Sequence, residues 1–456
     1  MLHRAIGEVP GLKSRVARLA TGIMVRLVMG WSVALATGGF LVRAIAAEGP
    51  DLASSARVWK EQLATKILPY WYETTLDKTN GGYVLSDDAA KPARPATEKQ
   101  LVTQARLVWG FSHAHRKGFS DGKHDYLAAA SHGVKFLLEK MRDAEQGGYF
   151  WKVDLAGRPV VDRKYLYGES FVIYALVEYH RASGDKAALE KAMELFHVIQ
   201  EKCHDLAHSG WLEHAQRDWT PILQQDGLIE VEVAGLRSAN AHLHWMEALA
   251  ELAEATSNEE VSEALSEALR LNATQFYPRD SAKSAFHRNP DWSPVTDPKS
   301  AGLSYGHNVE FAWLMIRAEE VLGRKPSWGH FEAILDHALR YGYDNARGGL
   351  YNRGFENQPA SDRDKVWWSQ AEMVAALTYS LKHQATASRR EALEKLITFI
   401  DRYQANPGDR IWLDTVTEDG RPKSTAKAHN WKANYHDVRG MLIFIDGLGE
   451  KAAAKP

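Results

Sequence analysis

Apolar residues recur at spacings of three and four along most of the chain after Pro50, as in helices that bury one face. No long linker rich in Pro, Gly or Ser interrupts this pattern. The helices that it predicts span residues 51–72, 99–117, 125–141, 165–183, 187–203, 237–256, 260–275, 305–322, 330–341, 366–383, 389–404 and 434–448. The pattern therefore predicts an all-α chain.

A short motif recurs between pairs of these helices. It consists of Asp or Asn, three further residues, a small pair in the better copies and a large apolar residue, which is typical of a turn entering a short extended stretch. The copies are DKTNGGY (77–83), DAEQGGY (143–149), DLAHSGW (205–211), DSAKSAF (280–286), DNARGGL (344–350) and NPGDRIW (406–412). Hairpins of about 65 residues are longer than common solenoid repeats. We therefore predict an (α/α)6 barrel of six helical hairpins, one domain over residues 51–450, with open stacking of the hairpins as the alternative.

In such a barrel, polar residues on the inner helices can face only the central cavity. Arg106 stands beside an apolar stripe, and its guanidinium could hold hydroxyls or an oxyanion. Asn240 and His244 are four residues apart, so both project from one helix face, with Glu247 nearby.

The stretch SYGHNVEFAW (304–313) places His307 in a first helical turn, with Glu310 one turn below. The positive end of the helix dipole favours a neutral histidine there. We expect Glu310 to hold the ring by a hydrogen bond and to support its proton, which would tune a base near neutral pH. Two ligands do not make a metal site, and the helical zinc pair is His-x-x-x-His, so no metal is predicted.

Two further helix starts carry candidates. KVWWSQAE contains Trp367, Trp368 and Gln370. Adjacent helical residues diverge by about 100°, so we expect one tryptophan to face the core and the other the cavity or a loop, with two core tryptophans as the alternative. HNWKANYH contributes Trp431 and His436. Three histidine-bearing helix starts thus face a predicted common cavity.

Composition narrows the partners. The 56 Lys plus Arg residues balance 58 Asp plus Glu, so no basic field favours nucleic acid. The 15 Trp and 17 Tyr suit hydroxyl-bearing ligands such as sugars. The single cysteine, Cys203, allows no intramolecular disulfide and no cysteine-based metal site.

An uncharged apolar run at residues 27–42 follows several arginines and precedes a small-x-small sequence that ends at Ala46. This arrangement predicts an export signal over residues 1–47, removed near Ala46 or Ala47, and a periplasmic or secreted protein without membrane attachment. A retained anchor is the main alternative, although 16 residues are fewer than the ~20 that span a bilayer. A misassigned start or a soluble extension is the other.

With these motifs in hand, the sequence resembles the N-acylglucosamine 2-epimerase superfamily over roughly residues 55–448. The superfamily includes cellobiose 2-epimerases, mannose isomerases and related aldose–ketose isomerases. The motifs, in the family's order, are QARLVWGFS, KYLYGESFVIYAL, NAHLHWMEAL, SYGHNVEFAWL, KVWWSQAE and WKANYH. They are most similar to the cellobiose 2-epimerase branch, and the fold that the resemblance implies is again an (α/α)6 barrel.

The resemblance also implies roles for individual residues. His307 and His436 match the family's catalytic pair, and His244 matches a histidine that contacts the substrate. The positions that match substrate-binding residues are Arg106, Tyr167, Asn240, Glu310 and Trp431, and with less agreement Trp368, Gln370 and Glu232.

The implied activity is epimerisation of an aldose at C2, in which two histidines transfer protons through a cis-enediolate without a metal or other cofactor. The implied substrate is a mono- or disaccharide of mannose, glucose, N-acylglucosamine or cellobiose type. An aldose–ketose isomerase of the mannose isomerase type would use the same residues. A glycoside hydrolase or lyase would need paired carboxylates, which no segment supplies at a fitting spacing. A sugar-binding protein without activity is the last alternative. The exact sugar and the oligomeric state are not specified.

Overall fold

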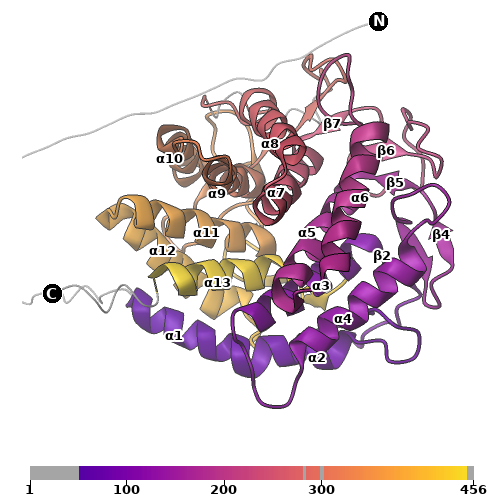
Figure 1. Ribbon diagram of the computed structural model, residues 1–456. Coiled ribbons are helices and arrows are strands. Elements are labelled where there is room, and N and C mark those ends of the chain that lie inside the picture. The colour runs from indigo at the N-terminus through magenta and orange to yellow at the C-terminus, as the bar shows by residue number, and fades with distance from the viewer. Residues whose placement is uncertain (1–50, 281–283, 298–301, 449–456) are drawn as a thin grey trace, which may run out of the picture. The chain divides into compact units, whose positions relative to one another are not determined.

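The computed structural model describes residues 51–280, 284–297 and 302–448, all within the unit Glu48–Pro456 (Figure 1). The predicted export signal at residues 1–47 lies outside the described residues. Within the described part of the chain, no helix combines the length and apolar character needed to cross a bilayer.

Six helical segments form the outer layer, and each buries one face. In α8, the buried residues recur at three and four spacing from Val261 to Leu271, which is the pattern of an amphipathic helix. The first segment consists of α1 and α2 joined by a π-helical turn at Leu63–Ile67. The outer helices are α1 (Leu52–Gln62), α2 (Leu68–Thr75), α4 (Tyr126–Phe136), α6 (Lys186–Lys202), α8 (Glu259–Leu271), α10 (Trp328–His337) and α12 (Ala387–Phe399).

Six inner helices alternate with the outer helices along the chain and are buried on almost all sides. In α5, for example, every residue from Leu166 to Tyr179 is buried. Each inner helix packs against the next, and α13 packs against α1. The inner helices are α3 (Leu101–Arg116), α5 (Leu166–Ser183), α7 (Ala239–Thr256), α9 (Tyr305–Val321), α11 (Trp367–His383) and α13 (His436–Leu448). The predicted (α/α)6 barrel is confirmed.

Short antiparallel strands connect successive hairpins. The strand that enters an inner helix pairs with the strand that follows the next turn, so Ser304 lies opposite Arg353. The pairs are β2 (Glu98–Gln100) with β3 (Lys152–Asp154), β5 (Lys164–Tyr165) with β6 (His214–Ala215), β7 (Arg237–Ser238) with β8 (His287–Arg288), β9 (Leu303–Ser304) with β10 (Arg353–Gly354), β11 (Lys365–Val366) with β12 (Thr415–Val416), and β14 (Ala426–Ala428) with β1 (Asp87–Asp88). Two further strands, β4 (Pro159–Val161) and β13 (Pro422–Ser424), extend the sheets of β3 and β12. The last pair joins the two ends of the domain and closes the ring.

The repeated motif forms the predicted turns. The copies at 77–83, 143–149, 205–211, 344–350 and 406–412 are each closed by an antiparallel bridge at the final apolar residue. The copy at 280–286 includes residues outside the described part of the chain. In three copies a lysine from the following strand binds the turn aspartate: the pairs are Lys99–Asp77 at 2.8 Å, Lys164–Asp143 at 3.1 Å and Lys365–Asp344 at 2.8 Å.

The fourth residue of several inner helices also binds these turns. The Gln104 side chain accepts from the backbone N of Tyr83 at 2.8 Å and donates to its carbonyl at 2.9 Å. Gln370 makes the same two bonds to Leu350, at 2.7 and 2.9 Å. The fourth position is thus used to attach helix to turn, where it satisfies two buried backbone groups.

Candidate active site

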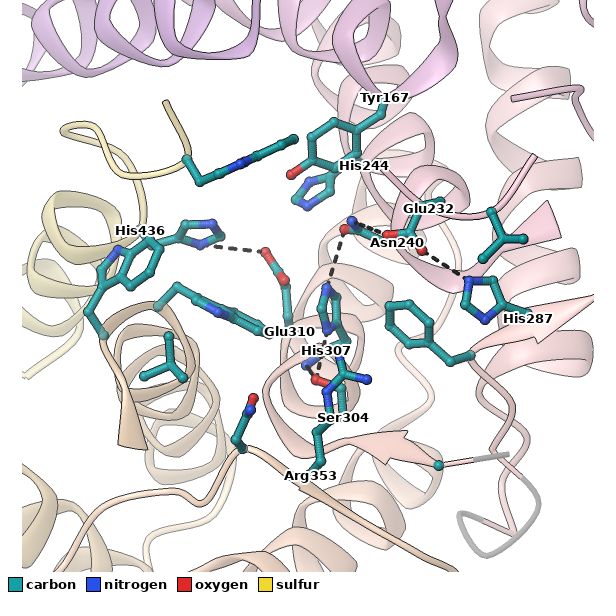
Figure 2. Close-up of a pocket in the computed structure, with 18 of the residues that line it drawn as sticks. Tyr167, Glu232, Asn240, His244, His287, Ser304, His307, Glu310, Arg353 and His436 are labelled. Carbon is teal, nitrogen blue, oxygen red and sulfur yellow. Dashed lines mark hydrogen bonds and ion pairs between the residues drawn. The ribbon is translucent and has the colours of Figure 1, made fainter. Parts of the chain in front are cut away.

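A cavity of about 540 Å³ opens where the inner helices begin (Figure 2). Side chains from α3, α5, α7, α9, α11 and α13 converge on it, together with residues of the connecting loops. Nine of the ten predicted site residues line it: Arg106, Tyr167, Asn240, His244, His307, Glu310, Trp368, Trp431 and His436.

Most of these residues occupy equivalent positions in their helices. The second and sixth residues of an inner helix lie one turn apart on one face, and that face is turned toward the cavity. Second residues are Tyr167, Asn240 and Trp368, and sixth residues are Arg106, His244 and Glu310. In α9 the second residue is Gly306, where a Cβ atom would lie 2.6 Å from Trp368 and from Ser369. Glycine thus allows the start of α9 to pack closely against α11.

Gln370 does not line the cavity, and the expectation that it binds substrate is corrected. It is fully buried, and its amide bonds to Leu350 and to the carbonyl of Val366. As a fourth helical residue, it performs the same structural role as Gln104. Of the tryptophan pair, Trp367 belongs to the buried core and also borders the cavity, whereas the less buried Trp368 lines the cavity.

His307 is held by uncharged partners. Its Nδ1 lies 2.8 Å from Ser304 Oγ, and its Nε2 lies 3.3 Å from Asn240 Oδ1. The Asn240 amide nitrogen donates to Glu232 at 2.8 Å, and since a carboxylate only accepts, the amide oxygen must face the histidine. His307 therefore carries its proton on Nε2. The predicted bond from Glu310 to this ring is wrong, because Glu310 turns to Arg439 instead.

Glu232 reaches the cavity from the loop before α7. Its other oxygen lies 3.1 Å from His287 Nε2, so the carboxylate links β8 to Asn240 (Figure 2). Its backbone is left-handed, with φ of 58°, a conformation that is strained for a residue with a side chain. The hydrogen bonds to Asn240 and His287 hold the Glu232 side chain in place despite this strained backbone.

His436 is held by a charged group. Its Nδ1 lies 2.7 Å from Glu372 Oε1, and the other Glu372 oxygen accepts from Trp313 Nε1 at 3.0 Å. The carboxylate requires the His436 proton to be on Nδ1, which leaves the lone pair on Nε2. The ring of Trp368 contacts both catalytic candidates, with centroids 4.5 Å from His307 and 5.8 Å from His436.

The three histidines are uncharged at neutral pH. Burial lowers the pKa of His307 to about 3 and lowers the pKa of His436 well below its usual value. Burial also lowers the pKa of His244, whose Nδ1 lies 2.8 Å from Glu247. The expected pKa near 7 for His307 is therefore wrong, because desolvation dominates and no carboxylate contacts its ring.

Arg106 is a buried cation whose partners are all uncharged. It is 3% exposed, donates to the Tyr167 hydroxyl at 2.9 Å and to the Trp431 carbonyl at 2.9 Å, and stacks on Phe171 with a guanidinium–centroid distance of 4.4 Å. Among the described residues, no carboxylate forms an ion pair with it. A desolvated positive charge on a cavity wall is suited to stabilising an oxyanion.

A second guanidinium, Arg439, binds three carboxylates beneath the cavity. It donates to Glu247, to Glu310 at 2.6 Å and to Glu372 at 2.8 Å. Glu247 and Glu372 in turn hold His244 and His436. The sequence predicted no paired carboxylates, but three separate inner helices bring these together.

The same cluster contains the only set of potential metal ligands found among the described residues. Atoms of Glu310, Glu372 and His436 lie within 4.8 Å of one another. However, Oε1 of both carboxylates already accepts from Arg439, and Nδ1 of His436 donates to Glu372. The donor set therefore fits a guanidinium and an imidazole N–H rather than a metal ion.

Sequence reasoning missed Arg439. One signal was present, because this arginine follows His436 within the otherwise apolar segment VRGMLIFI and therefore had to be buried with a partner. The orienting roles of Ser304 and Glu372 had no such signal, since their partners depend on how helices pack.

Known proteins share the sequence pattern and the fold of this chain. The family model N-acylglucosamine 2-epimerase (GlcNAc 2-epimerase) matches residues 81–439. Cellobiose 2-epimerase of Bacteroides fragilis is 29% identical over 398 residues, 86% of this chain and 98% of that protein. D-mannose isomerase of Marinomonas mediterranea is 24% identical over 401 residues, 85% and 96% of the two chains. The solved structure of cellobiose 2-epimerase from Spirochaeta thermophila DSM 6192 is 30% identical, with a TM-score of 0.77, and the match covers 87% of this chain and 97% of that one.

The chain therefore belongs to the N-acylglucosamine 2-epimerase family. It is an isomerase of carbohydrate metabolism, of the epimerase or the mannose isomerase kind.

Proposed function

We propose that the protein epimerises a reducing sugar at C2 by proton transfer between two histidines. The observation that carries this proposal is one cavity that combines two uncharged imidazoles, His307 and His436, with the guanidinium of Arg106, which forms no ion pair with a carboxylate among the described residues. Proton abstraction next to a carbonyl needs an uncharged base and a positive group for the oxyanion. The cavity supplies both.

His436 acts as the first base in this proposal. Its lone pair is on Nε2, and Glu372 stabilises the imidazolium that forms when the ring accepts the C2 proton. Arg106 stabilises the oxygen that becomes negative in the cis-enediolate, and His244, whose proton is on Nδ1, can accept a hydrogen bond from a sugar hydroxyl through Nε2.

His307 acts from the other side of the intermediate. Figure 2 shows Glu310 between His307 and His436 in this view. When the Nε2–H bond of His307 breaks and its proton adds to the opposite face of C2, the 2-epimer forms, and the proton taken up by His436 then restores the neutral His307 ring. Addition of a proton to C1 instead gives the ketose. The same residues serve both outcomes, which agrees with a family that contains both named activities.

The substrate class that we propose is an open-chain aldose of mannose, glucose or N-acylglucosamine type, or a disaccharide of cellobiose type. The volume of about 540 Å³ lies within the usual range of ligand pockets. Trp367, Trp368, Trp431 and Phe286 give the walls flat apolar faces, which suit the C–H faces of a sugar. The reaction needs neither a metal nor a nucleotide cofactor.

Deuterium exchange tests this proposal. The protein is incubated in D₂O with mannose, glucose, N-acetylglucosamine or cellobiose, and labelling at C1 and C2 is read by NMR. We expect deuterium at C2 of at least one sugar together with its 2-epimer. Label at C1 of a ketose would identify an aldose–ketose isomerase, and release of reducing ends from cellobiose without any label would refute both.

A further inference from the structure

Arg439 and the three carboxyl groups that it binds, Glu247, Glu310 and Glu372, form the Arg439 cluster, which carries more acidic groups than one guanidinium can balance. Glu247, Glu310 and Glu372 are each at most 3% exposed, and all three accept hydrogen bonds from Arg439. If all three were ionised beside one arginine, the cluster would hold two uncompensated negative charges away from water. Uncompensated negative charge away from water is unfavourable, and a buried carboxyl group avoids it by keeping its proton.

The contacts show which carboxyl is best suited to keep that proton. Glu247 also accepts from His244 at 2.8 Å and from the Tyr435 hydroxyl at 2.8 Å, and Glu372 accepts from His436 and Trp313. Among the described residues, the only hydrogen bond to Glu310 comes from Arg439, which reaches its Oε1; His436 Nδ1 lies 4.0 Å from the same oxygen, and Oε2 has no hydrogen-bond partner.

The electrostatics of the cluster agree with its contacts. Burial and the neighbouring Glu372 raise the pKa of Glu310 well above its usual value, although Arg439 opposes this. Burial also disfavours the ionised form of Glu247, yet Arg439, His244 and Tyr435 lower the pKa of that carboxyl. The other titratable groups that face Glu310 are Tyr167, Tyr277, Tyr435 and His436.

We propose that Arg439, Glu247 and Glu372 hold Glu310 as an uncharged carboxylic acid on the cavity wall, where it protonates the substrate oxygen that becomes negative in the enediolate. This inference rests on the proposed epimerase function. It assigns Glu310 a catalytic role and makes Arg439 the residue that positions it.

The proposed step is balanced in atoms and charge. As His436 removes the C2 proton, the electron pair of the C–H bond forms the C1–C2 double bond, and the carbonyl electrons move to O1. The Oε2–H bond of Glu310 then breaks and an O1–H bond forms. The new Glu310 carboxylate is stabilised by Arg439 Nη2, 2.6 Å from its Oε1. The proton returns to Glu310 when the carbonyl forms again.

The uncharged state can be tested without substrate. Infrared difference spectra of wild type minus Glu310→Gln, recorded in H₂O and D₂O, should show the C=O stretch of a protonated carboxylic acid. Glu178→Gln is the matched control, because Glu178 is also buried, at 3% exposed, but its pKa is lowered by His113 and Arg116 against the effect of burial. That difference spectrum should instead show loss of ionised carboxylate bands. An ionised Glu310 would overturn the proposal.

The catalytic role is tested by the rate of C2 hydrogen exchange. Glu310→Gln keeps the shape and a hydrogen-bond donor but cannot give up a proton, so we expect exchange to fall about 10²- to 10⁴-fold with KM nearly unchanged. Arg439→Lys should retain part of the charge but not the fork of donors, and should show a smaller fall together with an altered pH profile. Thermal unfolding of both variants separates these effects from loss of the fold.

The two proposals fail in different ways. Glu310→Gln exchanging C2 hydrogen at the wild-type rate would refute the acid role alone and leave the two-histidine mechanism standing. A wild-type protein that exchanges C2 hydrogen of none of the four sugars would refute the epimerase function, and with it the acid role.

Discussion

His307 and His436 face the same cavity but are held in opposite ways. His307 lies between the Ser304 hydroxyl and the Asn240 amide, whereas His436 donates to the Glu372 carboxylate. The first ring therefore presents an N–H at Nε2 and the second a lone pair. The two histidines thus begin the proposed reaction as different tautomers. A carboxylate can only accept a hydrogen bond, whereas an amide whose oxygen is fixed toward the ring can impose the opposite tautomer.

The difference also concerns charge. A positive charge on His436 would be stabilised by its hydrogen bond to Glu372, while a positive charge on His307 would meet no carboxylate at hydrogen-bond distance. The pair is therefore asymmetric before substrate arrives.

The largest effect is expected from removing either ring. His307→Ala and His436→Ala should each lower C2 exchange about 10³-fold or more, because each removes a proton-transfer group. Circular dichroism should show an intact fold. If either variant keeps near-normal turnover of a confirmed substrate, that histidine has no part in the mechanism.

Removing the charge behind His436 should have the next largest effect. Glu372→Gln keeps an acceptor for Nδ1 but no longer stabilises the imidazolium, so we expect kcat to fall on the order of 10²-fold. Steady-state kinetics would measure it. A fall confined to KM would show that Glu372 acts on binding only.

The matching change behind His307 should be milder. Ser304→Ala removes a neutral hydrogen bond that contributes about 1 kcal/mol, which corresponds to a rate effect of about fivefold. Ser304 is also the N-cap of α9, so the free energy of unfolding should fall by about 1 kcal/mol. Equal losses in the Ser304 and Glu372 variants would contradict the proposed asymmetry.

The lowered pKa of His307 predicts a pH dependence of stability. Its pKa is about 3 in the folded state and about 6.5 when unfolded, so only the unfolded chain takes up this proton between those values. The stability associated with uncharged His307 is fully present above about pH 6.5 and is lost as the pH falls toward 3. Urea unfolding at pH 7.5 and pH 5 should show a smaller loss for His307→Gln than for wild type. An identical loss in both proteins would place the titration elsewhere.

The smallest effect on catalysis is expected at Gln370. Gln370→Ala leaves the buried N–H and C=O of Leu350 without partners, so we expect about 2–4 kcal/mol lower stability and an unchanged KM. Gln104→Ala, which breaks the equivalent pair at Tyr83, is the control and should behave alike. A raised KM for the Gln370 variant alone would return this residue to the binding site.

Local pattern predicted much of the architecture. Twelve helices, the turn motif and nine of the cavity-lining residues follow from spacing and from family resemblance. Gln370 could have been assigned correctly from the sequence, because it occupies the same fourth position as Gln104 in a repeated pattern. Glu310 could not, since one turn of separation from His307 made a bond plausible. Only the tertiary fold brings Arg439 of α13 within 2.6 Å of Glu310 and offers it a different partner.

The sequence by itself determined the secondary structure, the sixfold repeat and the faces of the inner helices, because these depend on interactions between residues a few positions apart. The tertiary structure alone decided the charge and tautomer of each histidine and the convergence of three carboxylates on Arg439. Those properties depend on desolvation and on partners from helices that are as many as 192 residues apart in the chain. No local pattern encodes them, although they distinguish a proton-transfer site from a row of polar side chains.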